Sequence, residues 1–254
     1  MKWPIDNPEK LFSDGFRSEY GIECVLGSGS YGAVYKGEQP GVNRKVAVKV
    51  LLLDKADEEA IERFRQEARL AARVTHPNVV SIYGSGLDAK LPYIVYQFID
   101  GRNLQEHLQQ EGPMSVQATI ALVISIADGL KEIHEQNIVH RDLKSDNIII
   151  DKEGKPYITD LGVAKDGWDE GVKTKTGFIL GTPEYMAPEY VSAGTVTPAI
   201  DMYSLGVITY ECLLGKPPFT GSLLQVADAH IKRRTPRLPK ATPPALRDLV
   251  LQML

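Results

Sequence analysis

The chain has 254 residues, of which 43% are apolar and 24% are charged, and this composition is typical of a folded globular protein. Its net charge of -4 does not favour nucleic-acid binding through bulk charge, so we expect no nucleic-acid partner. The two cysteines, Cys24 and Cys212, are too few for a disulfide framework or a cysteine zinc site, and they favour a reducing, cytoplasmic setting.

The first hundred residues have the pattern of β-strands interrupted by one helix. Residues 1–19 lack the apolar core of a signal peptide and are interpreted as an N-terminal extension. Within 46–50 three valines share one face of a strand, whereas Ala47 and Lys49 share the other. The apolar spacing predicts strands at 25–26, 33–35, 45–53, 79–83 and 93–97, and a helix over 57–74.

From residue 103 onward the pattern becomes helical. The segment 115–136 is apolar on nearly every side, which predicts a buried central helix, and 201–214 has the same character. The longest apolar stretch, 120–127, is too short to span a bilayer, so we expect no membrane segment in this chain. Short strands are predicted at 148–150 and 157–159, and a long loop without periodicity over 162–188.

Glycines at positions 27, 29 and 32 form the first motif with chemical potential. This spacing allows a tight turn and a close approach of backbone amides to phosphate oxygens. An ordinary hairpin turn would explain the same three residues. Because 33–35 continues as a strand, the pattern does not fit a dinucleotide-binding fold, in which the glycines open a helix.

Lys49 and Glu67 form a candidate ion pair. Glu67 lies on or beside the apolar face of the predicted helix, and a carboxylate directed inward needs a partner because an unpaired buried charge is costly. Lys49, on the mixed face of its strand, is the natural candidate, although it could also be an edge residue that extends to solvent. A local pair of Glu67 with Arg63 or Arg69 is the alternative.

The segment 140–147 places two aspartates, an asparagine, a lysine and an arginine between a buried helix and a short strand. A charged surface loop is the simplest interpretation of such a cluster. However, apolar segments on both sides fix the loop against the core, which is how catalytic groups are held. Asp160, at the end of the next strand and followed by Leu161 and Gly162, is by itself an ordinary turn signal.

In this order and spacing the motifs resemble those of the eukaryotic-like (Hanks-type) serine/threonine protein kinases, and bacterial members most closely, over residues 20–254. The resemblance rests on Gly27-x-Gly29-x-x-Gly32-x-Val34, Val46-Ala47-Val48-Lys49, Glu67, His140-Arg141-Asp142, Asn147, Asp160-Leu161-Gly162, Ala187-Pro188-Glu189 and Asp201. It implies an α+β, bilobal fold. A small antiparallel-sheet lobe with one helix (20–99) would join a larger, mainly helical lobe (100–254), with an ATP cleft between them and a hinge near residue 100.

The resemblance also implies roles for individual residues. Asp142 would orient the substrate hydroxyl and accept its proton, and Lys144 would lie near the transferred phosphoryl group. Asn147, also part of the catalytic set, and Asp160 would hold Mg²⁺, with Mn²⁺ as an alternative ion. The ATP-binding residues implied are Leu26, Gly27, Ser28, Gly29, Ser30, Tyr31, Gly32, Ala33, Val34, Ala47, Lys49, Glu67, Gln97, Ile99 and Ile149.

Regulation by phosphorylation is implied as well. Arg141 corresponds to the arginine that binds a phosphorylated residue of the activation segment in this family. Thr174 and Thr176 lie where bacterial relatives autophosphorylate, although they would also be ordinary as solvated loop threonines. The partners implied are protein substrates and, for phosphorylation in trans, a second copy of the chain.

The chain departs from the family pattern at several positions. Leu161 replaces the usual Phe, Ser145 stands where many relatives have Pro, and Asn103 lacks a carboxylate that would attract basic substrates. The arginine that pairs with Glu189 in the family would lie beyond Leu254, so we expect a truncated domain, and a membrane anchor of the parent protein could lie outside this segment. The favoured activity is serine/threonine kinase. A nucleotide-binding pseudokinase scaffold and a small-molecule phosphotransferase are the alternatives.

Overall fold

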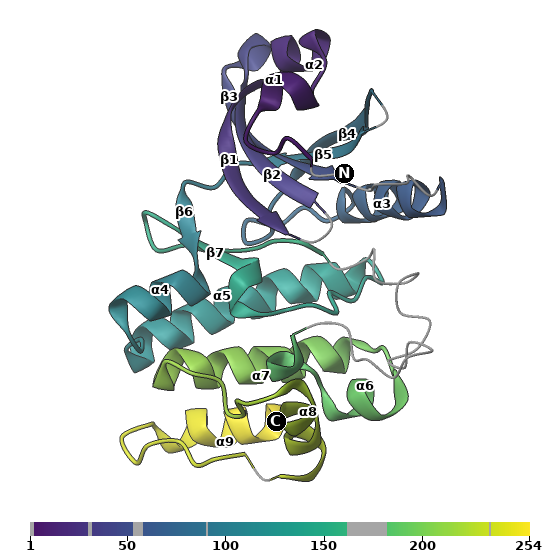
Figure 1. Cartoon of the computed structure of the whole chain (residues 1–254). Helices are drawn as coiled ribbons and strands as arrows, with labels where there is room; N and C mark the ends of the chain where they lie inside the picture. The colour runs from purple at the N-terminus through teal and green to yellow at the C-terminus, as the bar shows by residue number, and fades with distance from the viewer. Residues whose placement is uncertain (1–2, 30–31, 53–57, 90, 162–181, 234) are drawn as a thin grey trace. The chain divides into compact units, whose positions relative to one another are not determined.

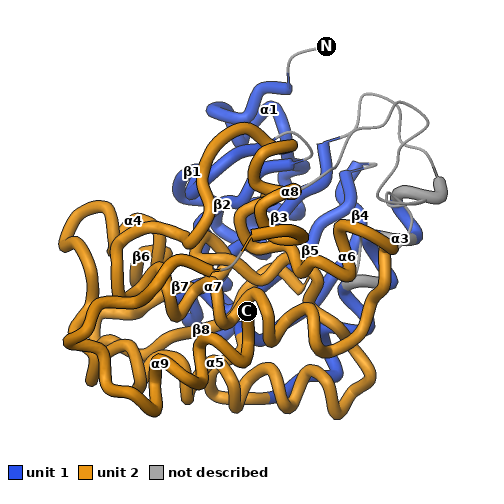
Figure 2. Tube along the Cα trace, turned by 90° about the horizontal axis from the view of Figure 1, so that it is seen from below, with its two compact units in different colours: residues 1–75, 80–99 blue, residues 76–79, 100–254 orange. Residues whose placement is uncertain are grey.

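The computed structural model describes residues 3–29, 32–52, 58–89, 91–161, 182–233 and 235–254 (Figure 1). These residues form two compact units (Figure 2). Unit 1 contains residues 1–75 and 80–99, and unit 2 contains residues 76–79 and 100–254. Among the helices described, none is long and apolar enough to cross a membrane.

Unit 1 is built on a five-stranded antiparallel sheet with the strand order β1-β2-β3-β5-β4. The strands are β1 (Gly21–Gly29), β2 (Gly32–Gln39), β3 (Arg44–Leu51), β4 (Ile82–Asp88) and β5 (Leu91–Gln97). Its helices are α1 (Pro8–Leu11), α2 (Asp14–Glu19) and α3 (Glu58–Ala71), with a 3-10 turn η1 (Pro40–Val42) before β3. The strands predicted around 25, 33–35, 45–53 and 93–97 and the helix after residue 57 are therefore confirmed.

One face of this sheet packs against the N-terminal helices. Tyr35 of β2 and the valines of β3 are buried there, together with Phe12 and Phe16, whose rings stack with centroids 4.7 Å apart. Ser13 begins α2 by accepting a hydrogen bond from the Phe16 amide, and its own amide and hydroxyl donate to the carboxylate of Asp88 (2.8 and 2.6 Å). Residues 3–19 are thus part of the core of unit 1.

The opposite face of the sheet carries Lys49 and is covered by α3. Lys49 pairs directly with Ile94 of β5, and Ile94 packs against Phe64 and Ala68 of the helix. Residues paired across an antiparallel ladder lie on the same face. The sequence-predicted separation of valines from Ala47 and Lys49 is therefore confirmed, with the valines buried and Lys49 only partly so.

Unit 2 is mainly helical. Its helices are α4 (Leu104–Glu111), α5 (Val116–Glu135), α6 (Pro188–Ala193), α7 (Pro198–Leu214), α8 (Leu223–Lys232) and α9 (Pro244–Met253). A three-stranded sheet has the order β6-β7-β8, formed by β6 (Gly101–Asn103), β7 (Ile148–Asp151) and β8 (Pro156–Ile158). Two 3-10 turns, η2 (Ser145–Asn147) and η4 (Pro183–Tyr185), complete the described elements that the site uses.

The core of unit 2 lies around α7, which packs against α5 and α9 (Figure 1). Gly206 allows the close approach of α9, because a Cβ at this position would be 2.8 Å from the Cβ of Met253. The buried helix predicted over 115–136 is present as α5, but not all of its apolar residues are buried: Ile120 and Ile124 are 37% and 57% exposed. An apolar sequence shows which residues can be buried, and only the packing partners decide which ones are.

The strand predicted at 79–83 was also displaced. The observed β4 begins at Ile82, whereas Val79 forms an isolated parallel bridge to Ile158, the last residue of β8. Gly84 and Gly86 have low strand propensity, so the sequence gives a weak signal for β4, but the hairpin with β5 stabilises the strand.

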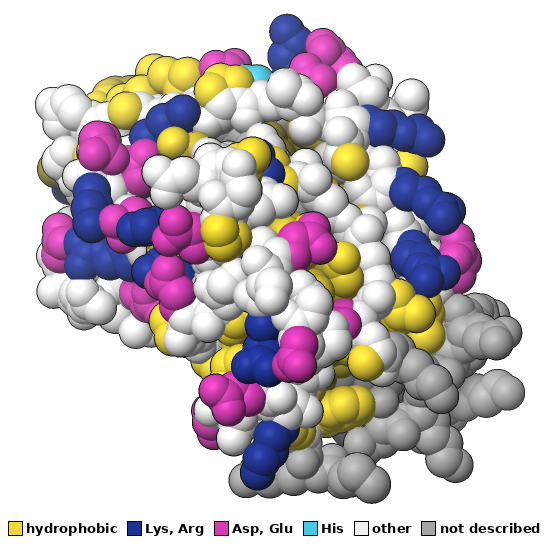
Figure 3. All heavy atoms as spheres, turned by 90° about the horizontal axis from the view of Figure 1, so that it is seen from above, with side chains coloured by type: hydrophobic (Ala, Val, Ile, Leu, Met, Phe, Trp, Pro, Cys, Tyr) yellow, Lys and Arg dark blue, Asp and Glu magenta, His cyan; other side chains and the backbone are white. Residues whose placement is uncertain are grey.

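The face drawn in Figure 3 carries interspersed Lys, Arg, Asp and Glu side chains. Ion pairs such as Lys36 with Glu23 show the same mixing of charge.

Candidate active site

The polar loop that follows α5 is fixed in unit 2 by the carboxylate of Asp201. This residue lies in the first turn of α7 with no exposed surface. Its Oδ2 accepts a hydrogen bond from the His140 amide (2.8 Å), and its Oδ1 accepts one from the Arg141 amide (2.9 Å). The Nε2 atom of His134, in the last turn of α5, lies 2.8 Å from Oδ2. One buried carboxylate therefore connects α7, the end of α5 and the beginning of the loop.

Backbone strain at Arg141 turns the chain at this point. Its φ is 64°, in the left-handed region, which costs a residue with a side chain about 1–3 kcal/mol. The fully buried ring of His140 supports the turn, because its Nε2 lies 2.9 Å from the Thr159 carbonyl oxygen and its Nδ1 accepts from the Asp142 amide (3.3 Å). Buried groups on both sides thus hold a strained loop in place, as expected for a functional site.

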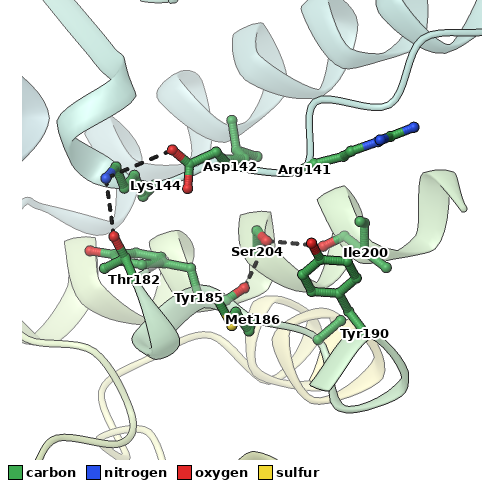
Figure 4. A pocket seen from close by; sticks show the side chains of 11 residues that line it. Arg141, Asp142, Lys144, Thr182, Tyr185, Met186, Tyr190, Ile200 and Ser204 are labelled. Carbon is green, nitrogen blue, oxygen red and sulfur yellow. Dashed lines mark hydrogen bonds and ion pairs between the residues drawn. The ribbon is translucent and has the colours of Figure 1, made fainter. Parts of the chain in front are cut away.

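Asp142, Lys144 and Asn147 lie together in this loop. The amide nitrogen of Asn147 donates to the backbone oxygen of Asp142 (2.8 Å) and to its carboxylate Oδ2 (3.3 Å). The ammonium of Lys144 is 3.8 Å from the same Oδ2. It also donates a hydrogen bond to the hydroxyl of Thr182 (3.0 Å), which lies on the opposite side of the pocket shown in Figure 4. The residues that the resemblance assigned to catalysis are therefore adjacent.

Asp160 follows β8, two positions after its last residue, Ile158. The Thr159 amide donates to the backbone oxygen of Asn147 (2.9 Å), which holds the end of β8 beside the loop. Asp160 itself has a φ of 52°, a second strained position. The side-chain nitrogen of Asn147 donates its hydrogen bonds within the loop, so its side-chain oxygen is the atom that could bind a metal ion. That oxygen and the Asp160 carboxylate are the hard donors that Mg²⁺ prefers.

This donor set fits a metal ion that also binds phosphates. Within the described part of the chain, no group of three or more His, Cys, Asp or Glu side chains could hold a metal by itself. A site with two protein oxygens requires further oxygens from phosphate and water, as is typical of Mg²⁺ bound together with a nucleotide. The chemistry of Asn147 and Asp160 therefore fits the group that the resemblance implies.

The predicted phosphate-binding glycines lie in the β1–β2 hairpin of unit 1. A Cβ at Gly32 would be 2.2 Å from the Val50 carbonyl oxygen, so packing alone explains this glycine. A Cβ at Gly27 or Gly29 would have no atom within 4 Å, so their lack of a side chain has no packing cause. Leu26 and Ser28 belong to the same strand, whereas Ser30 and Tyr31 lie outside the described residues.

The other predicted nucleotide-binding residues of unit 1 divide between the two sheet faces. Val34 pairs with Lys49, so the two side chains share the partly exposed face with Ala47. Ala33 points to the opposite face and is 1% exposed, so only its backbone could contact a ligand. Glu67 belongs to α3, but its side chain is outside the described residues, and its pairing with Lys49 stays a prediction.

At the end of β5 the Gln97 amide already donates to the Ser81 carbonyl oxygen (2.9 Å). A backbone contact of Gln97 with a ligand would therefore use its carbonyl oxygen. Ile99, the last residue of unit 1, is buried, and Ile149 lies half-buried in β7 of unit 2. Thr174 and Thr176 lie outside the described residues.

Sequence reasoning did not assign Thr182 to the site. Its hydroxyl accepts from Lys144, a residue 38 positions earlier in the chain. No local pattern predicts a contact over that separation. Glu189, expected to be a buried carboxylate without its partner, is half-buried in the first turn of α6, where the helix dipole favours a negative charge.

Comparison with known proteins places this geometry in context. A family model described as "Protein kinase domain" matches residues 20–254. The chain is 37% identical over 238 residues to the serine/threonine-protein kinase PknA of Mycobacterium tuberculosis H37Rv, covering 91% of this chain and 55% of the relative. It is 35% identical over 247 residues to PrkC of Bacillus subtilis 168 (95% and 38%). It is 38% identical over 222 residues to PknL of M. tuberculosis H37Rv (87% and 55%). The chain thus spans about half the length, or less, of these curated relatives.

Proposed function

The chain belongs to the protein kinase family, and we propose that it transfers the γ-phosphoryl group of ATP to serine or threonine hydroxyls of proteins. The observation that carries this proposal is the cluster of Asp142, Lys144 and Asn147 in one loop held by Asp201. The expected fold class agrees with the family, since an antiparallel five-stranded sheet precedes a mainly helical unit.

In this proposal the chain's own groups position the reactants. The carboxylate of Asp142 orients the substrate hydroxyl and accepts its proton while the hydroxyl oxygen bonds to the γ-phosphorus. The bond from the γ-phosphorus to the β–γ bridging oxygen breaks in the same step, and ADP is released. Asn147 fixes both the backbone and the carboxylate of Asp142, so the base is held before substrate arrives. The ammonium of Lys144 stabilises charge on the phosphoryl oxygens. A magnesium ion, with manganese as an alternative, would neutralise phosphate charge when bound at Asn147 and Asp160.

For the nucleotide itself, we propose that the backbone of the β1–β2 hairpin contacts the phosphates and that Lys49, paired with Glu67, binds them by charge. Open space at Gly27 and Gly29 supports this assignment, because a Cβ added at either position would have no atom of the described residues within 4 Å. Val34 and Ala47 would contact the adenine ring together with Ile149. The Gln97 carbonyl and the Ile99 backbone would bond its edge.

Regulation follows the same proposal. Arg141 would bind a phosphate on Thr174 or Thr176, added by a second copy of the chain in a homodimer. The cytoplasm is the proposed compartment, and any membrane attachment of the parent protein would lie outside this segment. Incubation with Mg-ATP should therefore place phosphate on Thr174 or Thr176, and phosphopeptide mapping that finds both unmodified in an active preparation would reject this step.

The activity itself is tested with Asp142→Asn. Phosphate transfer from labelled ATP to a generic basic protein should fall about 10²- to 10⁴-fold, because the base is lost. ATP binding, measured by the thermal shift it causes, should be retained, since the nucleotide contacts do not include this carboxylate. Asp128→Asn, at an exposed position of α5, is the matched control and should keep full activity. Equal turnover of wild type and Asp142→Asn would reject the assignment, and a wild type that binds ATP without transfer would favour a pseudokinase.

A further inference from the structure

A buried chain of hydrogen bonds joins the catalytic loop to the segment after residue 181 and to α7. The hydroxyl of Ser145 is 2.8 Å from the phenolic oxygen of Tyr185, and that oxygen is 2.7 Å from Oε2 of Glu211. The three residues are 0%, 6% and 5% exposed. They come from three elements, η2, η4 and α7, that are far apart in the sequence.

The hydrogen bonds of this series all run in one direction. Tyr185 has one hydroxyl hydrogen, which it donates to the carboxylate of Glu211. The hydrogen between Ser145 and Tyr185 therefore comes from Ser145, and the order of donation is Ser145 to Tyr185 to Glu211. Hydrogen bonds in such a series polarise and strengthen one another. Burial raises the pKa of Glu211, whereas the hydrogen bonds of the two hydroxyls lower it, so they help to stabilise a carboxylate in the interior.

Lys144 and Ser145 contact the same segment from neighbouring positions. The backbone of Lys144 is extended (φ -158°, ψ 168°), so consecutive side chains here point in opposite directions. Lys144 bonds Thr182 at the surface of the pocket, and Ser145 bonds Tyr185 in the interior. The Ser204 hydroxyl of α7 donates to the Tyr185 carbonyl oxygen (2.8 Å) and holds the same residue through its backbone (Figure 4).

We propose that Ser145 is a positioning residue that sets the place of residues 182–185 relative to the catalytic base Asp142, acting through Tyr185 and Glu211. Because Ser145 is fully buried, it would act on a substrate only through other residues. It acts on the segment that lies directly across the pocket from Asp142. The role rests on the proposed kinase function, because it concerns the geometry of a protein substrate at that base. Ser145 stands where many relatives have Pro, which lacks the hydroxyl that begins this series of hydrogen bonds.

A double-mutant cycle on Ser145→Ala and Tyr185→Phe tests the role. Ser145→Ala should lower kcat for a peptide substrate about tenfold, the effect of one lost buried hydrogen bond on a positioned base, and leave the KM for ATP unchanged. In the Tyr185→Phe background the same substitution should change kcat less than twofold, because its partner atom is already absent. Ser125→Ala, whose hydroxyl bonds only the α5 backbone, is the matched control and should keep the wild-type kcat.

Two results overturn the inference. One is an active wild type whose Ser145→Ala variant keeps its kcat. The other is full multiplication of the two single effects in the double variant. If Tyr185→Phe unfolds too easily to assay, the cycle uses Glu211→Gln, which keeps an acceptor for Tyr185 but removes the charge that polarises the series. The effect of Ser145→Ala on kcat should then become smaller without vanishing, and full multiplication of the two single effects would overturn the inference. A wild type that transfers no phosphate contradicts the proposed function itself and removes this role with it, so the two failures are distinct.

Discussion

Replacement of Asp201 by Asn should destabilise unit 2 far more than its single-atom change suggests. The carboxylate is fully buried and accepts from the amides of His140 and Arg141 while His134 contacts it as well. Asparagine offers one acceptor oxygen, so its amide nitrogen must face a backbone N–H or the histidine. Loss of a charge-assisted hydrogen bond costs about 1.5–3 kcal/mol, and the orphaned donor adds about 1–3 kcal/mol.

The sum is about 2.5–6 kcal/mol in the free energy of unfolding. For a chain of this length each kcal/mol moves the melting temperature by about 2–4 °C, so a loss of about 5–24 °C is expected. Thermal unfolding followed by circular dichroism measures the loss. Hydrogen exchange of the amides in 140–147 shows whether the strained turn at Arg141 has opened. Asp228→Asn, which breaks only an exposed pair with Lys232, should move the transition by no more than about 2–4 °C.

A variant that melts within 2 °C of wild type and keeps the amides of 140–147 protected would refute this reasoning. It would mean that the loop holds its conformation without the carboxylate. The strained φ of Arg141 would then need another cause, and Asp201 could not be the residue that connects α7 with the loop 140–147.

Three further outcomes are expected. Asp88→Asn should weaken the hold of Ser13 on the start of α2 and speed proteolysis within residues 1–19, and an unchanged cleavage rate would contradict the packing of that segment. Burial lowers the pKa of His230 from 6.5 to about 4, so the unfolded chain binds a proton at a higher pH than the folded chain. Between pH 6.5 and 4 the free energy of unfolding in urea should therefore fall more steeply for wild type than for His230→Gln, by up to about 1.4 kcal/mol per pH unit. Equal slopes for the two proteins would show that the histidine is not the cause. Thr182→Val should lower kcat about threefold through loss of the hydrogen bond from Lys144, measured with a peptide at saturating ATP, and a kcat equal to wild type would make that bond irrelevant.

Local pattern predicted much of the fold because period-two alternation and helical spacing are properties of neighbouring residues. The valines of β3 and the apolar positions of α3 were placed correctly for this reason. The N-terminal helices were missed because each is a turn or two long, too short for a periodic signal. Phe12 and Phe16, four residues apart, were the available sign, since their rings stack in the core of unit 1.

The candidate site was predictable to the extent that its residues lie close in sequence. Asp142, Lys144 and Asn147 share one loop, and their contacts follow from short separations. Contacts of Thr182 and Tyr185 with that loop join residues about forty positions apart, and no periodicity encodes them. Such contacts depend on how α7 and the preceding turn η4 pack against the loop. They therefore emerge only in the folded unit.

The most direct test of kinase activity is phosphoamino-acid analysis of a protein substrate after incubation with the chain, magnesium and ATP labelled in its γ-phosphoryl group. The proposed function predicts label recovered as phosphoserine or phosphothreonine with wild type and almost none with Asp142→Asn. Label that stays in ATP and inorganic phosphate with wild type, under conditions in which ATP binding is demonstrated, would contradict it.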